Sequence, residues 1–252
     1  ALALHEAGVL SYIQDKGEVN LVELVKHFEA NEGYLNVGLH VIAAQGWIDH
    51  VILGEDDILL RSNKITATAV SLIPLYKDVV ELIQVSGKYH SRRFEKEPFL
   101  ILERVFKKFK NRYALKSTTD IPKNEIQEQV LKHIEGVLVG PTVVALGMGG
   151  MFHKYFMEAS FKPEEFHEEG DLFERLLDVF VFLGWFDKSD GTFSFTEKGL
   201  FYARRASAYG VTVSYVPMFR KVSELMFGDP HVFWKEPAGA KEIHVDREMN
   251  VW

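Results

Sequence analysis

The pattern of apolar and polar positions is repeated in two segments of the chain, residues 34–49 and 172–187. In each segment apolar residues recur at the helix period, and the pattern ends in a Gly-Trp pair, Gly46-Trp47 and Gly184-Trp185. A glycine just after a helix can adopt the left-handed conformation that terminates it. Each segment therefore predicts an amphipathic helix that stops at the glycine and continues into an aromatic-rich strand.

Each predicted strand is followed by a turn and a second strand, which is the pattern of a β-hairpin. The turns are Gly54-Glu55-Asp56-Asp57 and Ser189-Asp190-Gly191, and the return strands are residues 58–60 and 192–196. The Asp-Gly pair makes the second turn the stronger signal. A helix that leads into such a hairpin is typical of a winged-helix unit, so two such units are expected.

Further helices complete the predicted fold. Asn20 and Glu23 have the spacing of a capping box, so a helix is expected to begin there. Helix-period apolar stripes fill the middle of the chain, whereas prolines and a glycine interrupt its last part. The prediction is a mainly α fold with tandem winged-helix-like units, a helical segment that joins them and an extended C-terminal tail. The corresponding boundaries are residues 1–70, 71–140, 141–228 and 229–252.

Composition narrows the classes of protein. The 252 residues are 47% hydrophobic, which is ample for packed cores, and the absence of cysteine excludes disulfides and cysteine-ligated metal sites. The longest nearly uncharged run, residues 136–152, is interrupted by Gly140-Pro141, which favours a buried segment over a membrane span. No signal peptide is recognisable at the beginning. A cytoplasmic protein without membrane contact is expected.

The distribution of charge argues against nucleic acid as the partner. The net charge is −7, and the two predicted recognition helices, residues 34–45 and 172–183, contain Arg175 as their one Lys or Arg. DNA-binding proteins usually present a basic face to the phosphates. The basic stretch Lys88–Arg112, with interleaved aromatic residues, could meet an acidic partner, but its aromatic spacing favours an ordinary amphipathic helix. A winged-helix transcription regulator remains the alternative prediction.

Candidate catalytic chemistry is sparse. The segment Val143–Gly150 resembles a strand and a glycine-rich turn that cradles a nucleotide or S-adenosylmethionine, but it lacks the Walker lysine and the dinucleotide-binding spacing. A closely packed helix is the preferred interpretation. His244 and Asp246 alternate as two metal ligands could, but two residues do not make a metal site. Neither a catalytic residue nor a metal is therefore assigned to this chain.

Three segments resemble known methyltransferases. Residues 184–199 resemble the winged-helix lid of class I O-methyltransferases that use S-adenosylmethionine. Phe233–Pro237 and His244–Trp252 resemble the lead-in to the methyltransferase core of polyketide synthase loading modules of the apratoxin and saxitoxin type. The resemblance implies that most of the chain is the helical lid of such an enzyme and that the core follows the tail.

The resemblance also implies a reaction and partners. The adjoining core would bind S-adenosylmethionine, with a metal ion there as a further expectation, and would methylate a malonyl-type acyl group carried by an acyl carrier protein. The lid would cover cofactor and substrate, and Arg247 would pair with a substrate carboxylate. A non-enzymatic protein–protein adaptor is the other alternative. The residues expected near the substrate are His244, Asp246, Arg247, Asn250, Tyr215 and Phe219.

Overall fold

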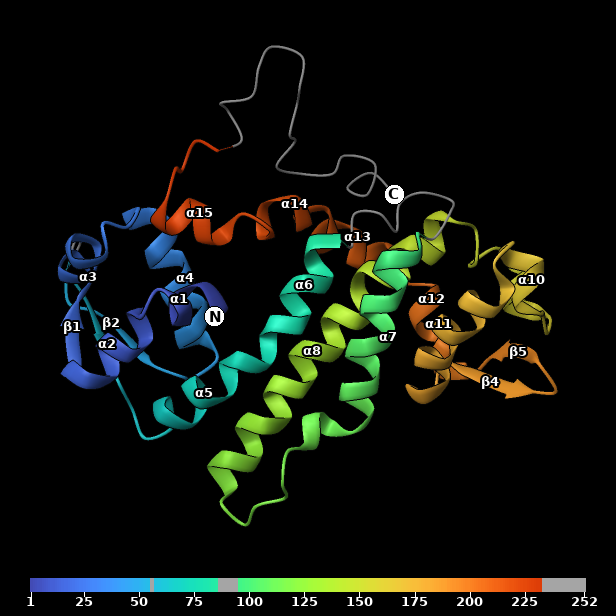
Figure 1. Cartoon of the computed structure of the whole chain (residues 1–252), viewed down its shortest axis with the longest axis horizontal. Coiled ribbons are helices and arrows are strands. Elements are labelled where there is room, and N and C mark those ends of the chain that lie inside the picture. Colours follow the sequence, from blue (N-terminus) through green and yellow to red (C-terminus); the bar gives the residue numbers. More distant parts are fainter. Residues whose placement is uncertain (55–56, 86–94, 233–252) are drawn as a thin grey trace. The chain divides into compact units, whose positions relative to one another are not determined.

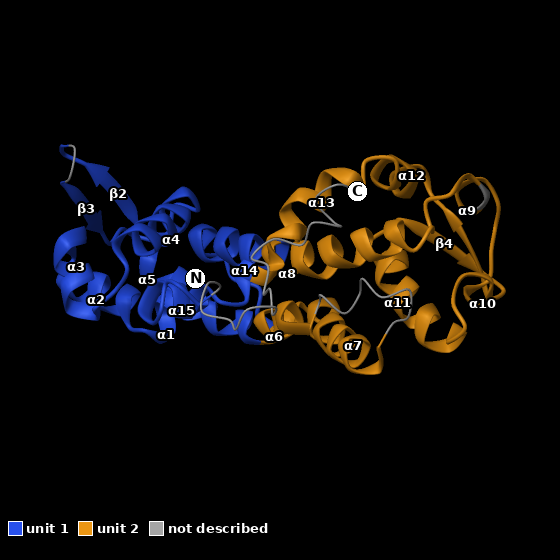
Figure 2. Ribbon diagram, turned by 90° about the horizontal axis from the view of Figure 1, so that it is seen from above, with its two compact units in different colours: residues 1–77, 115–132, 218–243 blue, residues 78–114, 133–217, 244–252 orange. Residues whose placement is uncertain are grey.

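The computed structural model describes residues 1–54, 57–85 and 95–232, which form two compact, mainly helical units (Figures 1 and 2). The predicted mainly α fold class is confirmed. The predicted boundaries 70/71 and 140/141 fall inside the helices Thr66–Leu72 and Ile121–Met148, and the four-part division stays a prediction. Among the described residues, unit 1 comprises 1–54, 57–77, 115–132 and 218–232, and unit 2 comprises 78–85, 95–114 and 133–217.

Unit 1 has the order of helices and strands that defines a winged helix. Three antiparallel strands lie in the order β1-β3-β2, so the return strand β3 is central and pairs with both neighbours. The hairpin β2–β3 was predicted, whereas the short strand β1 was not. The elements are α1 (Leu2–Glu6), α2 (Val9–Lys16), β1 (Glu18–Asn20), α3 (Leu21–Phe28), α4 (Glu32–Ala44), β2 (Asp49–Ile52), β3 (Ile58–Arg61), α5 (Thr66–Leu72) and η1 (Ile73–Tyr76).

Asparagine side chains begin the two helices that precede the hairpin. The side chain of Asn20 accepts a hydrogen bond from the Val22 N–H, at 2.8 Å, and starts α3. The predicted partner in a capping box, Glu23, instead accepts a hydrogen bond from the Tyr12 hydroxyl, at 2.8 Å. At the other end of the motif Gly46 has φ of 80°, the left-handed conformation expected of a residue that ends a helix.

Trp47 anchors the first Gly-Trp motif in the core of unit 1. Its indole is 2% exposed and stacks on the Tyr76 ring, with 6.4 Å between ring centroids. The Trp47 Nε1–H donates a hydrogen bond of 2.7 Å to Gln129 Oε1 on α8 (Ile121–Met148). The Thr66 hydroxyl donates to the Trp47 carbonyl oxygen at 2.7 Å. The motif therefore joins the hairpin to α5, which follows it directly, and to α8, which lies far from it in the sequence.

Helix α8 continues through Gly140-Pro141, so the predicted boundary between residues 140 and 141 lies inside a helix. The segment Val143–Gly150 is therefore the end of a helix and a turn, as the preferred interpretation held. By length and composition α8 could cross a membrane, but 67% of its most apolar window is buried inside the protein. Val143 and Val144 are fully buried. Burial of this kind is typical of the core helix of a folded domain.

Unit 2 contains the second winged helix. Its hairpin β4–β5 closes through Asp190 and Gly191, both with positive φ, as a two-residue Asp-Gly turn requires. Phe161 adds a single β-bridge to Phe193, through two backbone hydrogen bonds of 2.9 and 2.8 Å. The elements are α6 (Lys77–Val85), α7 (Lys96–Lys110), η3 (Arg112–Ala114), α9 (Lys154–Glu158), α10 (Pro163–Phe166), α11 (Gly170–Phe182), β4 (Phe186–Ser189), β5 (Thr192–Phe195), α12 (Glu197–Ala203) and α13 (Ser207–Ser214).

His167 lies in the turn between α10 and α11 and should make unit 2 sensitive to acid. It is 6% exposed, and its Nδ1 accepts a hydrogen bond of 3.0 Å from the Glu169 N–H, which needs the unprotonated nitrogen. Burial lowers the pKa of His167 below its ordinary value of 6.5, although Glu168 and Glu169 oppose the shift. Its stabilising contribution should be complete above that ordinary value and should be lost as the pH falls through the lower pKa of the folded state.

We expect the urea midpoint of unit 2 to decrease between about pH 7 and about pH 5, and to decrease less in His167→Gln. Glutamine can still accept the hydrogen bond but does not titrate. Exposed His153 provides the matched control, because His153→Gln should keep the pH dependence of the original chain. An unchanged slope in His167→Gln would remove His167 as its source.

Candidate functional site

The sequence-predicted site residues divide into two sets. His244, Asp246, Arg247 and Asn250 lie outside the described residues, and their predicted roles stay predictions. Tyr215 and Phe219 are described, and their side chains are 39% and 42% exposed. Tyr215 ends α13 in unit 2, whereas Phe219 ends α14 (Val216–Phe219) and is assigned to unit 1. Both aromatic side chains are therefore available for contact with another molecule.

Phe219 borders an apolar cavity of about 330 Å³ in unit 1. The walls come from α1, α4, the end of α14 and α15 (Val222–Phe227). None of the residues that line it carries a charged side chain, and the Tyr34 hydroxyl is the one polar side-chain group among them. The lining residues are Ala1, Ala3, Leu4, Tyr34, Val37, Gly38, Val41, Met218, Phe219, Val222, Leu225 and Met226.

Two local contacts position the wall formed by α15. The Asn31 N–H donates a hydrogen bond of 2.8 Å to the Met226 carbonyl oxygen, which fixes the end of α15 beside the start of α4. Gly38 lies under the Met226 side chain, so closely that a Cβ there would overlap the methionine methyl group. The glycine thus lets α4 and α15 approach. Of the predicted site residues only Phe219 lines this cavity, because the other lining residues come from segments far apart in the chain.

Two acidic residues of the second recognition helix, α11, contact a lysine of the β4–β5 hairpin. Lys188 of β4 contacts Asp178 at 2.8 Å and Glu174 at 3.0 Å. The hydrogen bond to Asp178 raises the pKa of Lys188, so the ammonium group stays charged. Arg175, the lone basic residue of this helix, lies 3.8 Å from Glu103. The face of α11 therefore offers phosphate groups little positive charge.

The first recognition helix, α4, presents histidine and asparagine where a DNA reader would carry lysine or arginine. His50 Nε2 and Asn36 Oδ1 are 3.0 Å apart, and the His40 and His50 rings meet edge to face at 5.2 Å. Burial, followed by the proximity of His40, lowers the pKa of His50. The imidazole is therefore held toward its neutral form, which does not attract an anion.

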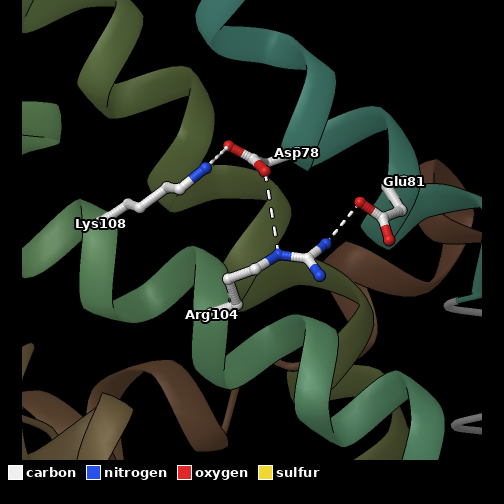
Figure 3. Close-up of polar contacts among 4 residues, drawn as sticks. All are labelled: Asp78, Glu81, Arg104 and Lys108. Carbon is white, nitrogen blue, oxygen red and sulfur yellow. Dashed lines mark hydrogen bonds and ion pairs between the residues drawn. The ribbon is translucent and has the colours of Figure 1, made fainter.

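The described part of the basic stretch 88–112 is largely paired within unit 2. Figure 3 shows Arg104 and Lys108 of α7 directed at the carboxylates of Asp78 and Glu81 on α6. Lys108 contacts Asp78 at 2.6 Å, and Arg104 binds Glu81. Surface pairs of this kind contribute about 0–1 kcal/mol each. The pairing fits the amphipathic-helix interpretation and leaves less charge for an acidic partner.

The acidic and histidine side chains do not gather into a metal-binding group in the part of the chain that the structure describes. Across residues 1–54, 57–85 and 95–232, no group of three or more His, Asp or Glu side chains is arranged to hold a metal ion. An acidic hollow of about 400 Å³ lies at the start of α11, lined by Glu164, Glu168, Glu169, Asp171 and Glu174 among others. Three of these carboxylates, Glu164, Glu168 and Glu169, belong to the acidic segment 164–169, whose pattern predicts a solvated helix start.

Two family models match the chain. The AprA N-terminal domain matches residues 1–50, and the AprA winged helix domain matches residues 135–229. Together they cover more than half of the sequence. The chain contains two AprA domains. The resemblance to the lid region of apratoxin-type loading-module methyltransferases is thereby confirmed. A comparison with curated proteins gives no match.

The AprA matches correspond to the structural elements. The AprA N-terminal domain covers α1 to α4 and the first residues of β2, and the AprA winged helix domain begins within α8 and ends after α15. The AprA winged helix match therefore includes α10, α11 and the β4–β5 hairpin. The AprA domains make this chain a region associated with polyketide synthases.

Proposed function

We propose that this AprA-type chain is the lid of a methyltransferase that uses S-adenosylmethionine to methylate a malonyl-type acyl group on an acyl carrier protein. The observation that carries the proposal is the presence of both AprA domains, in this order, in one chain. In this proposal the adjoining core binds S-adenosylmethionine and any metal ion. The enzyme acts in the cytoplasm.

The lid would act by covering the reacting groups and excluding water. Closure of an apolar surface over an active site strengthens the electrostatic interactions inside it. The exposed rings of Tyr215 and Phe219 supply such surface. Arg247 would bind the substrate carboxylate, because a guanidinium group matches a carboxylate with two parallel hydrogen bonds. His244, Asp246 and Asn250 would approach the active site from the same tail.

The charges on the recognition helices favour the lid function and argue against a transcription regulator. The charge of Lys188 is already paired with the carboxylates of Glu174 and Asp178 on α11, so it is not available to bind DNA phosphates. A gel shift at low salt tests the alternative. Sequence-independent binding that weakens steeply with salt, as counterion release requires, would favour a DNA-binding function.

The proposal is tested with a longer polypeptide that joins this chain to the proposed methyltransferase core. That polypeptide, incubated with S-adenosylmethionine and a malonyl-loaded carrier protein, is expected to give a methylated acyl group detectable by mass spectrometry of the intact carrier. Arg247→Ala should lower kcat/KM by about tenfold to a hundredfold, the cost of one lost charged hydrogen-bond pair. Arg247→Lys should recover part of that loss.

The matched control is Arg175→Ala, at an exposed arginine of α11, which should leave kcat/KM unchanged. An unchanged kcat/KM in Arg247→Ala would refute the role of Arg247. Absence of any methylated product would refute the methyltransferase lid. If the carrier protein bound to that polypeptide without being methylated, the adaptor function would be favoured over the methyltransferase lid.

A further inference from the structure

Helix α12 of unit 2 and the turn after it present positive charge that no carboxylate neutralises. Between Glu197 and Glu224 the sequence has five Lys or Arg residues and no Asp or Glu, although the whole chain has 29 basic and 36 acidic residues. Lys198, Arg204 and Arg205 of this stretch are exposed, and within the described ranges none of them forms an ion pair. This sets α12 apart from β4 and from the α6–α7 contact, where the cations bind acidic side chains.

An exposed aromatic ring lies among these cations. Phe201 is 50% exposed, and it is three or four positions from each of Lys198, Arg204 and Arg205, which makes it their common neighbour on a helix. The Arg205 guanidinium group lies over the Phe201 ring, 3.9 Å from its centroid, and its Nη1 donates a hydrogen bond of 3.1 Å to the Phe201 carbonyl oxygen. Lys198 Nζ donates to the Leu183 carbonyl oxygen at 2.6 Å. Neutral groups thus position two of the cations without cancelling their charge. Lys198, Phe201, Arg204 and Arg205 are called the α12 face below.

The α12 face suits a single phosphate group that lies beside apolar surface. A guanidinium group binds phosphate oxygens with two parallel hydrogen bonds, and an arginine stacked on a ring is already ordered for that contact. Nucleic acid is a poorer fit, because the strong binding of DNA comes from roughly 6–10 phosphate contacts, more than the cations of the α12 face can make. The net charge of −7 would also repel a polyanion from the rest of the chain.

We propose that the α12 face docks the acyl carrier protein by binding the phosphodiester that links the pantetheine arm to the carrier. The choice of a carrier protein rests on the proposed function, whereas the preference for one phosphate beside apolar surface follows from the α12 face. Arg204 and Arg205 would bind the phosphate oxygens, and the exposed ring of Phe201 would pack against the carrier beside the arm. The malonyl carboxylate at the other end of the arm would not contact the α12 face.

Calorimetric titration of the 252-residue chain with two forms of one carrier protein tests the proposal. The apo carrier has a bare serine hydroxyl, and the malonyl carrier has the phosphopantetheine arm on that serine. The malonyl carrier should bind at least about tenfold more tightly, because its phosphate gains charged hydrogen bonds that the apo form cannot make. Added salt should reduce the difference, since the α12 face is exposed. Equal Kd values for the two forms, or no binding of either, would overturn the proposal.

Arginine substitutions locate the phosphate contact. The double variant Arg204→Ala and Arg205→Ala should raise Kd for the malonyl carrier at least about tenfold and leave Kd for the apo carrier nearly unchanged. Arg175→Ala, at an exposed arginine of α11, is the matched control and should change neither value. Circular dichroism checks the fold, and Arg204→Ala alone should still weaken the malonyl carrier if the double variant unfolds. Equal Kd values for the control and the α12 variants would contradict a site on the α12 face.

Kinetics of the longer polypeptide separate this inference from the proposed function. The double variant should raise KM for the malonyl carrier without changing kcat, and it should not affect malonyl N-acetylcysteamine thioester, which has no phosphate. Carrier binding at the α12 face without methyl transfer would retain the docking surface and remove the methyltransferase. Methyl transfer that is indifferent to the α12 variants would do the reverse. A short DNA duplex that bound the α12 face more tightly than the malonyl carrier would refute carrier docking in favour of nucleic acid.

Discussion

Replacing Gly199 with alanine is expected to destabilise unit 2 by about 3 kcal/mol or more. Gly199 lies in the first turn of α12, where its N–H donates a hydrogen bond of 3.0 Å to the Thr196 hydroxyl. A Cβ at this position would overlap the carbonyl oxygen of Trp185. That carbonyl cannot move freely, because it accepts hydrogen bonds from the Thr196 N–H and hydroxyl at 3.0 and 3.1 Å.

The control is alanine at Gly136, a glycine inside α8 where a Cβ would meet no atom within 4 Å. Gly136→Ala should be neutral or stabilising by about 0.5–1 kcal/mol, since alanine is the better helix former. Urea unfolding measures both variants, and hydrogen exchange of β4 and β5 assigns the loss to unit 2. Similar stabilities for the two variants would contradict the close approach at Gly199.

Replacing Trp47 with alanine is expected to cost unit 1 about 3–5 kcal/mol. The substitution removes a fully packed indole and its stacking on Tyr76, and it leaves a cavity in the core. It also leaves Gln129 Oε1 without the indole N–H that donates to it at 2.7 Å. The Gln129 amide group is held toward that indole by its own hydrogen bonds to Gln45, at 3.0 and 3.2 Å.

Trp47→Phe separates packing from hydrogen bonding. Phenylalanine keeps much of the buried ring but cannot donate, so the expected cost is about 1–3 kcal/mol. Val22→Ala, at an exposed site on α3, should change stability by less than about 0.5 kcal/mol. Hydrogen exchange of β2 and β3 reports on unit 1 separately. If Trp47→Ala and Trp47→Phe were equally stable, the packing of the indole would not be the main contribution.

Periodicity and turn chemistry predicted the two hairpins because both signals are local. Gly46 and Gly184 have the positive φ that a helix end requires, and Asp190-Gly191 forms the predicted tight turn. Strand β1 was missed because its three residues become a strand only by pairing with β3, across forty positions of sequence. A boundary between two parts of the chain was expected at 140/141, but α8 continues through Gly140-Pro141 and is buried on several sides there.

Less of the candidate site than of the fold could be predicted from the sequence. Phe219 could be proposed from its place after the second wing, and the structure locates it at the wall of a cavity. Apart from Tyr34 and Gly38, the rest of the lining is valine, leucine, alanine and methionine, which single-sequence patterns assign to an ordinary core. The interaction of Lys188 with Glu174 and Asp178 was equally hidden, since it depends on the wing folding back along α11.

The two hairpins differ in how well they resist pairing with a strand from another molecule. In the second, the edge strand β4 carries Asp187 and Lys188, and charge on an edge strand opposes intermolecular pairing. In the first, the edge strand β2 ends in Ile52, and Ile52 and Leu53 are 67% and 60% exposed. Self-association of the chain through strand addition would therefore begin at the first hairpin rather than the second.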